Sequence, residues 1–103
     1  MTNTPMTNIG VTLCAIFRIP QDGLPAFQAY EAAVLPLVTE HTGVLQRRLR
    51  SLDGTVEVHV IWFPSASFVD AYRADPRRSV HADLFDASGA VAEVLTVADV
   101  EPG

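Results

Sequence analysis

The order of the predicted elements limits the fold of this chain more than any other feature of its sequence. Extended and helical patterns follow one another as strand, helix, strand, strand, helix, strand, and an Asp-Gly pair separates the two middle strands. This order predicts a split βαβ sandwich of the α+β class, with one four-stranded antiparallel sheet and both helical segments on one face. The other face of the sheet is then bare, and we expect a partner or a ligand to cover it.

Local signals place each element along the chain. Alternating and β-branched residues predict four strands, over residues 9–19, 44–51, 55–63 and 90–100. A first helix is expected between Asp22 and Gly43, with a kink at Pro36 because proline removes a backbone donor. A second helix begins near Ser65 and ends at Asp75-Pro76, and this dipeptide predicts the start of a separate short helix over 77–86.

The hairpin between residues 44 and 63 carries the polar residues of most interest. Its Asp53-Gly54 pair suits a two-residue type I′ turn, in which both residues take positive φ. The register that follows places three pairs opposite each other: Arg50 and Glu57, Arg48 and His59, and Leu45 and Trp62.

Alternation along these strands predicts which residues share a face. We expect one face of the hairpin to pack on the helices, and it contains Leu45, Leu49, Val56, Val58, Val60 and Trp62, interrupted by Arg47. The other face mixes polar and apolar residues, namely Gln46, Arg48, Arg50, Glu57, His59, Ile61 and Phe63. A dry core does not tolerate such a mixture. On the first strand, Thr12 and Cys14 are expected beside this mixed face, opposite Leu13, Ala15 and Phe17. The mixed face should line a pocket, a second subunit or water.

Length and composition narrow the class of protein. The 103 residues suffice for one domain, which we assign to residues 9–100, with a flexible polar N-terminus over 1–8. The net charge of -5 opposes binding to nucleic acid or to an anionic membrane, and no apolar run reaches the roughly 20 residues that span a bilayer. No secretory signal precedes residue 9, so we expect a cytoplasmic protein whose partner is a small molecule.

His59 is the candidate general base, near the middle of a central strand. Arg48 opposite it disfavours the imidazolium form and can stabilise a developing oxyanion, and Glu57 can orient the ring or the substrate. The alternative is structural: Glu57 and Arg50 form a cross-strand ion pair, and His59 is a partly buried polar residue in a dimer interface.

The other candidate residues have weaker patterns. Predicted substrate-binding residues around the base are Thr12, Cys14, Ile61, Phe63 and His81. Cys14 can instead be a small buried apolar residue, and His81 can instead be an exposed residue of a helix. His41 is expected only to complement a helix dipole. We expect Tyr30, Tyr72 and Trp62 to pack in the core. The three histidines lack the spacing of a metal site, and we predict neither a metal nor a cofactor.

The segment from His59 to Arg78 resembles a known group of proteins. The chain resembles a family of short proteins of unknown function in the dimeric α/β-barrel, or ferredoxin-like, superfamily over about residues 9–100. The resemblance is clearest in the strand that ends in Phe63-Pro64-Ser65 and in the aromatic helix that ends in Asp75-Pro76. That superfamily includes antibiotic-biosynthesis monooxygenases, polyketide cyclases, isomerases and haem-degrading enzymes. The resemblance implies a homodimer in which two sheets form a barrel around a cavity, and it fixes no reaction.

These observations lead to one hypothesis and two alternatives. We expect a cofactor-independent enzyme that performs acid/base chemistry, namely cyclisation, isomerisation or elimination, on an apolar metabolite such as one of natural-product biosynthesis. A cofactor-free monooxygenase is the alternative within enzymes. A non-catalytic binding or dimerisation module is the other alternative, which a cavity smaller than roughly 300 Å³ would favour.

Overall fold

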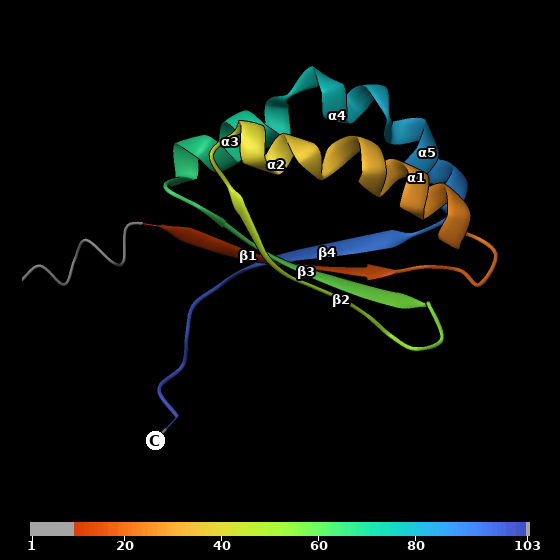
Figure 1. Cartoon of the computed structure of the whole chain (residues 1–103), viewed down its shortest axis with the longest axis horizontal. Coiled ribbons are helices and arrows are strands. Elements are labelled where there is room, and N and C mark those ends of the chain that lie inside the picture. The colour runs from red at the N-terminus through yellow and green to blue at the C-terminus, as the bar shows by residue number, and fades with distance from the viewer. Residues whose placement is uncertain (1–9, 103) are drawn as a thin grey trace, which may run out of the picture.

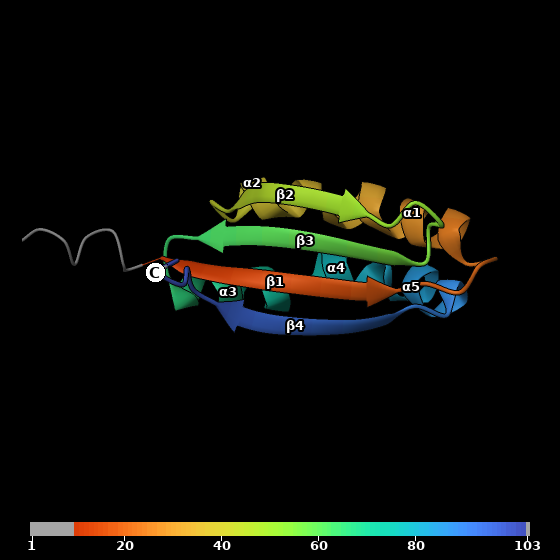
Figure 2. The ribbon, with the colours of Figure 1, turned by 90° about the horizontal axis from the view of Figure 1, so that it is seen from below.

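The computed structural model describes residues 10–102, which form a two-layer α+β sandwich (Figure 1). The elements in chain order are β1 (Val11–Arg18), α1 (Leu24–Val34), α2 (Pro36–Glu40), β2 (Val44–Arg50), β3 (Val56–Phe63), α3 (Ala66–Ala74), α4 (Pro76–Val80), α5 (Ala82–Ser88) and β4 (Val91–Val97). The strands form one antiparallel sheet in the order β2-β3-β1-β4. All the helices lie on one face, and the view from below shows the other face uncovered (Figure 2). The predicted ferredoxin-like α+β fold is confirmed, whereas the predicted flexible residues 1–8 lie outside the described residues.

Proline divides the first helical segment as predicted. α1 ends at Val34 and α2 starts at Pro36. Leu35 between them keeps a helical backbone, and its N–H donates to the Glu31 carbonyl at 2.9 Å. The buried residues of this segment are Phe27, Glu31, Val34, Leu37 and Val38. One charged residue therefore lies within the stripe that faces the sheet.

The second helical segment has two breaks. Asp75 caps α4 through a hydrogen bond from the Arg77 N–H to its carboxylate at 2.9 Å, which confirms the predicted start at Asp75-Pro76. A break at His81 then separates α4 from α5, so the single helix predicted over 77–86 is two helices. Gly89 ends α5 with φ of 71°.

The hairpin turn differs from its prediction. Gly54 has a positive φ of 77°, but Asp53 does not, so the turn is not type I′. Instead the Gly54 N–H donates to the Ser51 carbonyl at 2.9 Å, and the Asp53 carboxylate accepts hydrogen bonds from Thr55 and Ser51. These bonds, led by that from the Thr55 hydroxyl, hold the pKa of Asp53 at about 2.

The predicted register holds near the turn and shifts further along. Arg50 pairs with Glu57, and Arg48 pairs with His59. A β-bulge between Leu45 and Arg47 then places Leu45 opposite Ile61 rather than Trp62. The bulge reverses the alternation of β2, so Leu45 and Arg48 both lie on the helix side of the sheet.

The predicted faces of β3 were reversed. Glu57, His59, Ile61 and Phe63 are buried beneath the helices, and the intervening residues Val56, Val58, Val60 and Trp62 lie on the uncovered face. The reason is that the polar residues of β3 meet partners under the helices: Glu31 from α1 and two arginines from β2 satisfy them. Trp62 is therefore not a residue of the main core, which consists of Leu13, Val34, Leu37, Val38, Ile61, Phe63, Val69 and Tyr72.

The uncovered face of the sheet is largely apolar. We call it the open face, and its residues, which follow from the strand pairing, are Thr12, Cys14, Ile16, Arg18, Val44, Arg47, Leu49, Val56, Val58, Val60, Trp62, Val91, Glu93, Leu95 and Val97. Thr12 and Cys14 therefore lie on the opposite side of the sheet from His59. Within residues 10–102, none of the helices combines the length and apolar character needed to cross a membrane.

Candidate active site

A cavity of about 450 Å³ lies between the sheet and the helical layer. Its volume is within the range of roughly 300–1,000 Å³ that is typical of ligand sites. The walls are mainly apolar and aromatic, and the lining residues are Leu13, Ala15, Phe17, Phe27, Tyr30, Glu31, Val34, Leu35, His59, Ile61, Tyr72, Arg73, Arg78, Phe85, Ala92 and Val94. Ring centroids of neighbouring aromatic residues are 5.1 Å apart for Phe17 and Phe27 and 5.2 Å apart for Tyr30 and Phe85. The cavity thus offers flat apolar surfaces to a small ligand.

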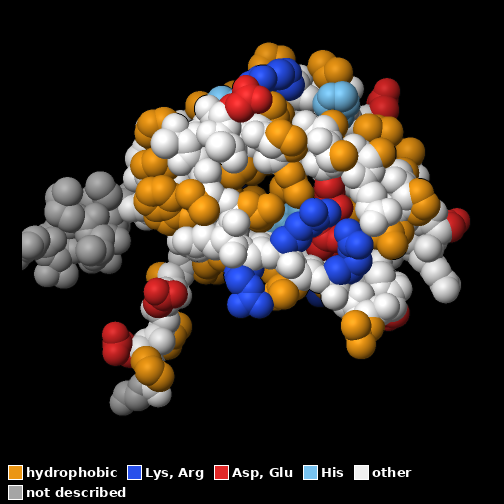
Figure 3. All heavy atoms as spheres, in the orientation of Figure 1, with side chains coloured by type: hydrophobic (Ala, Val, Ile, Leu, Met, Phe, Trp, Pro, Cys, Tyr) orange, Lys and Arg blue, Asp and Glu red, His pale blue; other side chains and the backbone are white. Residues whose placement is uncertain are grey.

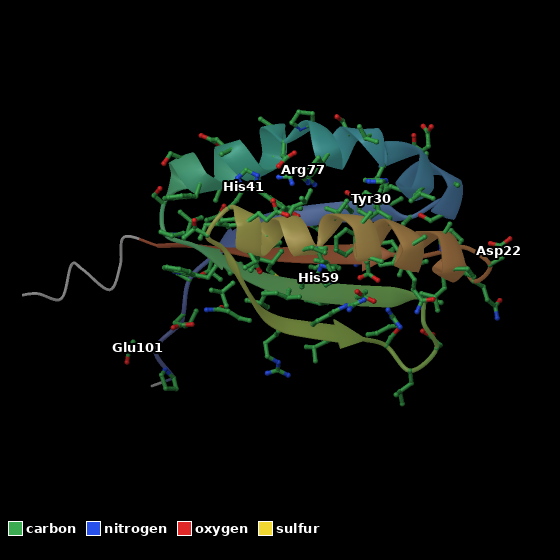
Figure 4. The ribbon with its side chains drawn as sticks, turned by 45° about the horizontal axis from the view of Figure 1, so that its top comes forward. Asp22, Tyr30, His41, His59, Arg77 and Glu101 are labelled. Atoms are coloured by element: carbon green, nitrogen blue, oxygen red, sulfur yellow. The ribbon has the colours of Figure 1, made fainter. Side chains whose placement is uncertain are left out.

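His59 lies in the sheet side of this cavity, held by two buried carboxylates. Figure 4 shows it beneath α1, between the helical layer and the sheet. Its Nε2 atom lies 2.6 Å from Glu57 Oε2 and 2.9 Å from Glu31 Oε2. The exposed fractions of the residues are 3% for His59, 3% for Glu31 and 0% for Glu57. Water therefore cannot hydrate these groups in the usual way, and each depends on its protein partners.

Two arginines of β2 compensate the buried carboxylates. Arg50 Nε donates to Glu57 Oε1 at 2.6 Å, and Arg48 Nε donates to Glu57 Oε2 at 3.1 Å. Arg48 Nη2 also donates to Glu31 Oε1 at 2.8 Å. Figure 3 shows arginine and acidic side chains gathered together below the helical layer. Two positive charges thus match two negative ones, and the predicted ion pair between Glu57 and Arg50 is confirmed.

The hydrogen bonds assign the two nitrogens of His59 to different roles. Both neighbours of Nε2 are carboxylate oxygens, which accept hydrogen bonds, so Nε2 carries a proton. Nδ1 makes no hydrogen bond to any residue between 10 and 102, and the ring borders the cavity. A carboxylate that holds one nitrogen of an imidazole in this way leaves the other as a base toward a ligand.

The same three residues have the geometry of a metal site. One ligand atom from each of Glu31, Glu57 and His59 lies within 4.8 Å of the others. Their oxygens, however, already accept hydrogen bonds from the two arginines, and the charges of the four groups cancel. A divalent cation would have to displace an arginine, so the arrangement favours an orienting role for the carboxylates.

The structure brings together only some of the predicted site residues. His59 and Ile61 line the cavity, whereas Arg48 and Glu57 lie behind His59, on a surface groove formed by Gln28, Arg48, Leu49, Arg50 and Glu57. Phe63 packs in the core against Tyr72, with ring centroids 5.3 Å apart. His81 lies between α4 and α5 and does not line the cavity. Thr12 and Cys14 are on the open face, where they cannot contact a ligand bound beside His59.

Sequence reasoning missed Glu31, Arg73 and Arg78. Glu31 follows Phe27 by four residues and precedes Val34 by three, so its position in an apolar helical stripe was a signal for a buried charge. Arg73 and Arg78 border the cavity from the helical layer, beside Tyr72. Burial is the main cause that raises the pKa of Tyr72. No local pattern distinguishes these two arginines from the other five.

Comparison with known proteins identifies the fold. No protein-family model matches the chain, and no curated protein matches its sequence. Among solved structures, Rv0793 from Mycobacterium tuberculosis is 20% identical with a TM-score of 0.72, covering 89% of this chain and 96% of its own. A putative antibiotic biosynthesis monooxygenase from Bacteroides thetaiotaomicron is 12% identical with a TM-score of 0.75, covering 93% and 94%. SnoaB, a cofactor-independent oxygenase from Streptomyces nogalater, is 18% identical with a TM-score of 0.68, covering 91% and 98%. The chain therefore shares the ferredoxin-like fold of these three proteins.

Proposed function

We propose that this protein is a cofactor-independent oxygenase that removes a proton from a small, largely apolar substrate and lets the resulting carbanion react with dioxygen. The observation that carries the proposal is the position of His59. Two buried carboxylates hold its Nε2 atom, and the ring borders an apolar cavity of ligand size. The fold shared with a cofactor-independent oxygenase favours this reaction over cyclisation, isomerisation or elimination.

The proposed reaction converts an activated CH₂ group into a carbonyl. His59 Nδ1 takes one C–H proton, and the electron pair stays on the substrate carbon as a conjugated carbanion. The carbanion gives one electron to dioxygen, and the resulting radical and superoxide combine to form a C–O bond. The peroxide anion takes the proton back from His59. Loss of the second C–H proton, with cleavage of the O–O bond, then leaves a C=O group and one water molecule.

The residues around His59 position it. Glu31 and Glu57 fix the tautomer that leaves Nδ1 as the base, and they stabilise the imidazolium that forms when it takes the proton. Arg48 and Arg50 compensate the charge of both carboxylates in the buried site. Arg48 thus acts through the carboxylates, and not on a substrate oxyanion as its sequence position suggested, because it does not line the cavity.

The first step is common to the other enzymatic reactions considered. Isomerisation, cyclisation and elimination also begin with proton removal, and oxygen uptake distinguishes them from oxygenation. A non-catalytic module whose interior is filled by side chains fits less well, because the cavity of about 450 Å³ exceeds the roughly 300 Å³ expected of the smallest ligand sites.

We also propose that the protein works as a homodimer in the cytoplasm. Val44, Leu49 and Leu95 on the open face are 49%, 48% and 44% exposed. Apolar residues of β3 and β1, among them Val58, Val60 and Ile16, connect them across the sheet. Such a contiguous apolar area on a sheet is typical of an interface. Pairing of two open faces would give the dimeric barrel that the resemblance implies, with each active-site cavity on the outer side of its own sheet.

A small ketone with an acidic C–H bond tests the base. We suggest 2-tetralone, whose C1 protons exchange with deuterium when they are removed. The wild-type protein should accelerate this exchange under anaerobic conditions, as measured by NMR in D₂O, and consume oxygen in air. His59→Gln should lower the exchange rate about 10²- to 10⁴-fold, the usual contribution of a general base.

His81→Gln is the matched control, since His81 does not line the cavity. It should retain the wild-type rate. Equal exchange by wild type and His59→Gln would exclude His59 as the base, and exchange without oxygen uptake would replace the oxygenase by an isomerase-type reaction.

A further inference from the structure

Arg78 lies at the helical side of the cavity without a carboxylate partner. Its guanidinium carbon is 4.6 Å from the centroid of the Tyr72 ring, and its Nη1 donates to the Arg73 carbonyl at 3.4 Å. Its Nε atom is buried and has no hydrogen-bond partner among residues 10–102. Aromatic stacking therefore holds the guanidinium in place while most of its donors remain unused.

The arginines with structural roles differ from Arg78. Arg48, Arg50 and Arg77 each contact at least one carboxylate at 2.8 Å or less. Arg78 has no carboxylate oxygen within 4.0 Å among the described residues. Its position is nevertheless half-buried and borders a largely apolar cavity. A cation there is costly unless an anion joins it, because burial removes part of its hydration.

A second arginine and an outer cleft accompany Arg78. Arg73, from the last turn of α3, borders the same cavity and also makes no ion pair within the described residues. Both arginines line a surface cleft of about 230 Å³ that adjoins the cavity, together with Tyr30, Ser79, Ala82, Phe85 and Asp86. Asp86 is the acidic residue of this cleft, and it lies beyond ion-pair distance of either arginine. The two positive charges thus stand where the cavity meets the surface.

We propose that Arg78, assisted by Arg73, binds a carboxylate group of the substrate, so that the substrate is an aromatic carboxylic acid. A planar guanidinium suits this role because two of its N–H groups can donate to both oxygens of one carboxylate. The apolar body of the substrate would lie along Phe17, Phe27 and Phe85, and its acid group would remain at the cleft. Glu31 does not compete for the arginines, since Arg48 already neutralises it.

The inference rests on the proposed function in one respect, since it places the substrate in the same cavity as His59. Arg78 and His59 border opposite layers of that cavity, one in the helices and the other in the sheet. An acid group held at Arg78 would then fix which carbon of the ring system reaches His59. This makes Arg78 a determinant of specificity rather than of proton transfer.

Two probes of the same shape and different charge test the site. We suggest 2-naphthoate and its neutral amide, 2-naphthamide, with binding measured by isothermal titration calorimetry. The wild-type protein should bind 2-naphthoate about tenfold or more tightly than 2-naphthamide, the usual value of one charge-assisted hydrogen-bond pair. Arg78→Gln should remove this preference by weakening the binding of 2-naphthoate and leaving that of 2-naphthamide within about twofold.

Two further variants separate charge from geometry. Arg78→Lys keeps the charge and loses the planar fork, so it should retain only part of the preference for 2-naphthoate. Arg47→Gln removes the same charge from the open face and should bind both probes as the wild type does. Circular dichroism of each variant establishes that it is folded.

The outcomes distinguish this inference from the proposed function. Equal binding of both probes by the wild type, or equal weakening of both by Arg78→Gln, would exclude the carboxylate site and leave the role of His59 intact. A charge preference that persists while His59→Gln exchanges 2-tetralone protons normally would support the carboxylate site and exclude the base. Failure of both probes to bind would exclude the carboxylate site, and the exchange of 2-tetralone protons would then decide the role of His59 by itself.

Discussion

At the residue scale, the four charged groups around His59 form one unit. Glu57 accepts hydrogen bonds from Arg48, Arg50 and His59, and it is fully buried. Glu31, in the helical layer, accepts hydrogen bonds from Arg48 and from His59. Removing one member of such a network costs free energy, because the charge that it paired with is then left uncompensated in a poorly hydrated place.

We therefore predict that Glu57→Gln destabilises the protein substantially. Removing one member of a buried ion-pair network costs about 3–5 kcal/mol, and we expect the lower end because the arginines are 44% and 31% exposed and can regain water. Urea unfolding at pH 7 measures this loss. Glu40→Gln is the control, since Glu40 is 53% exposed in its pair with Arg77 and should cost about 1 kcal/mol or less. Equal losses for the two variants would refute the buried network.

At the element scale, Asp75 joins three helices. It caps α4 through the Arg77 N–H, and its carboxylate also accepts from the Arg77 side chain. His41, at the end of α2, lies 2.7 Å from the same carboxylate through its Nε2 atom. Figure 4 shows His41 and Arg77 close together above the sheet. His41 thus does more than complement a helix dipole, because it ties α2 to the junction of α3 and α4.

The pKa of Asp75 predicts how this junction responds to acid. Hydrogen bonds from Arg77, and then from His41, hold the pKa of Asp75 well below its usual value. A lowered pKa means that the native state favours the carboxylate, so the contribution to stability is complete above about pH 3.9, the unfolded value, and declines as the pH falls through the native value.

The unfolding free energy of the wild type should therefore fall between pH 5 and pH 2 more steeply than that of Asp75→Asn. Urea unfolding at several pH values measures the two slopes. Asp70→Asn, at an exposed position of α3, should keep the wild-type slope. Parallel pH profiles for wild type and Asp75→Asn would show that this junction does not contribute to acid sensitivity.

At the scale of the whole molecule, the two faces of the sheet differ in what they contain. The helix side encloses the cavity and the charged groups, and the open face presents valine, leucine and isoleucine side chains. Cys14 belongs to the open face, where its pattern fits a small apolar residue of an interface. The cavity lies on the helix side of the sheet, away from the open face, so we expect the proposed dimer to stabilise the sheet rather than supply residues to the cavity.

Val60→Glu tests the interface from the middle of the open face. A carboxylate there cannot be buried against a second sheet, so we expect the variant to be monomeric and folded while the wild type is dimeric. Light scattering coupled to size-exclusion chromatography measures the mass of both. Val80→Glu is the control, since Val80 is 72% exposed on α4 and should leave the dimer unchanged. A monomeric wild type, or a dimeric Val60→Glu, would exclude an interface on this face.

Much of the architecture could be predicted because its signals are local. Pro36, Asp75-Pro76 and Gly89 break or end helices through their own backbone chemistry, and the elements between them follow from short-range periodicity. The His59 candidate also came from the sequence, as did its pairing with Arg48 across the hairpin. These features involve residues close to each other along the chain or joined by one turn.

The side on which the site lies could not be predicted in the same way. Both faces of β3 carry large apolar residues, Ile61 and Phe63 on one and Val60 and Trp62 on the other, so alternation alone does not choose between them. The choice depends on Glu31, which is 28 residues from His59 and contacts it only when α1 packs on the sheet. The amino-acid sequence by itself determined the order of the elements and supplied His59 as the candidate base. Only the tertiary structure decided which face is buried and which charges meet there, because both depend on contacts between side chains far apart in the chain.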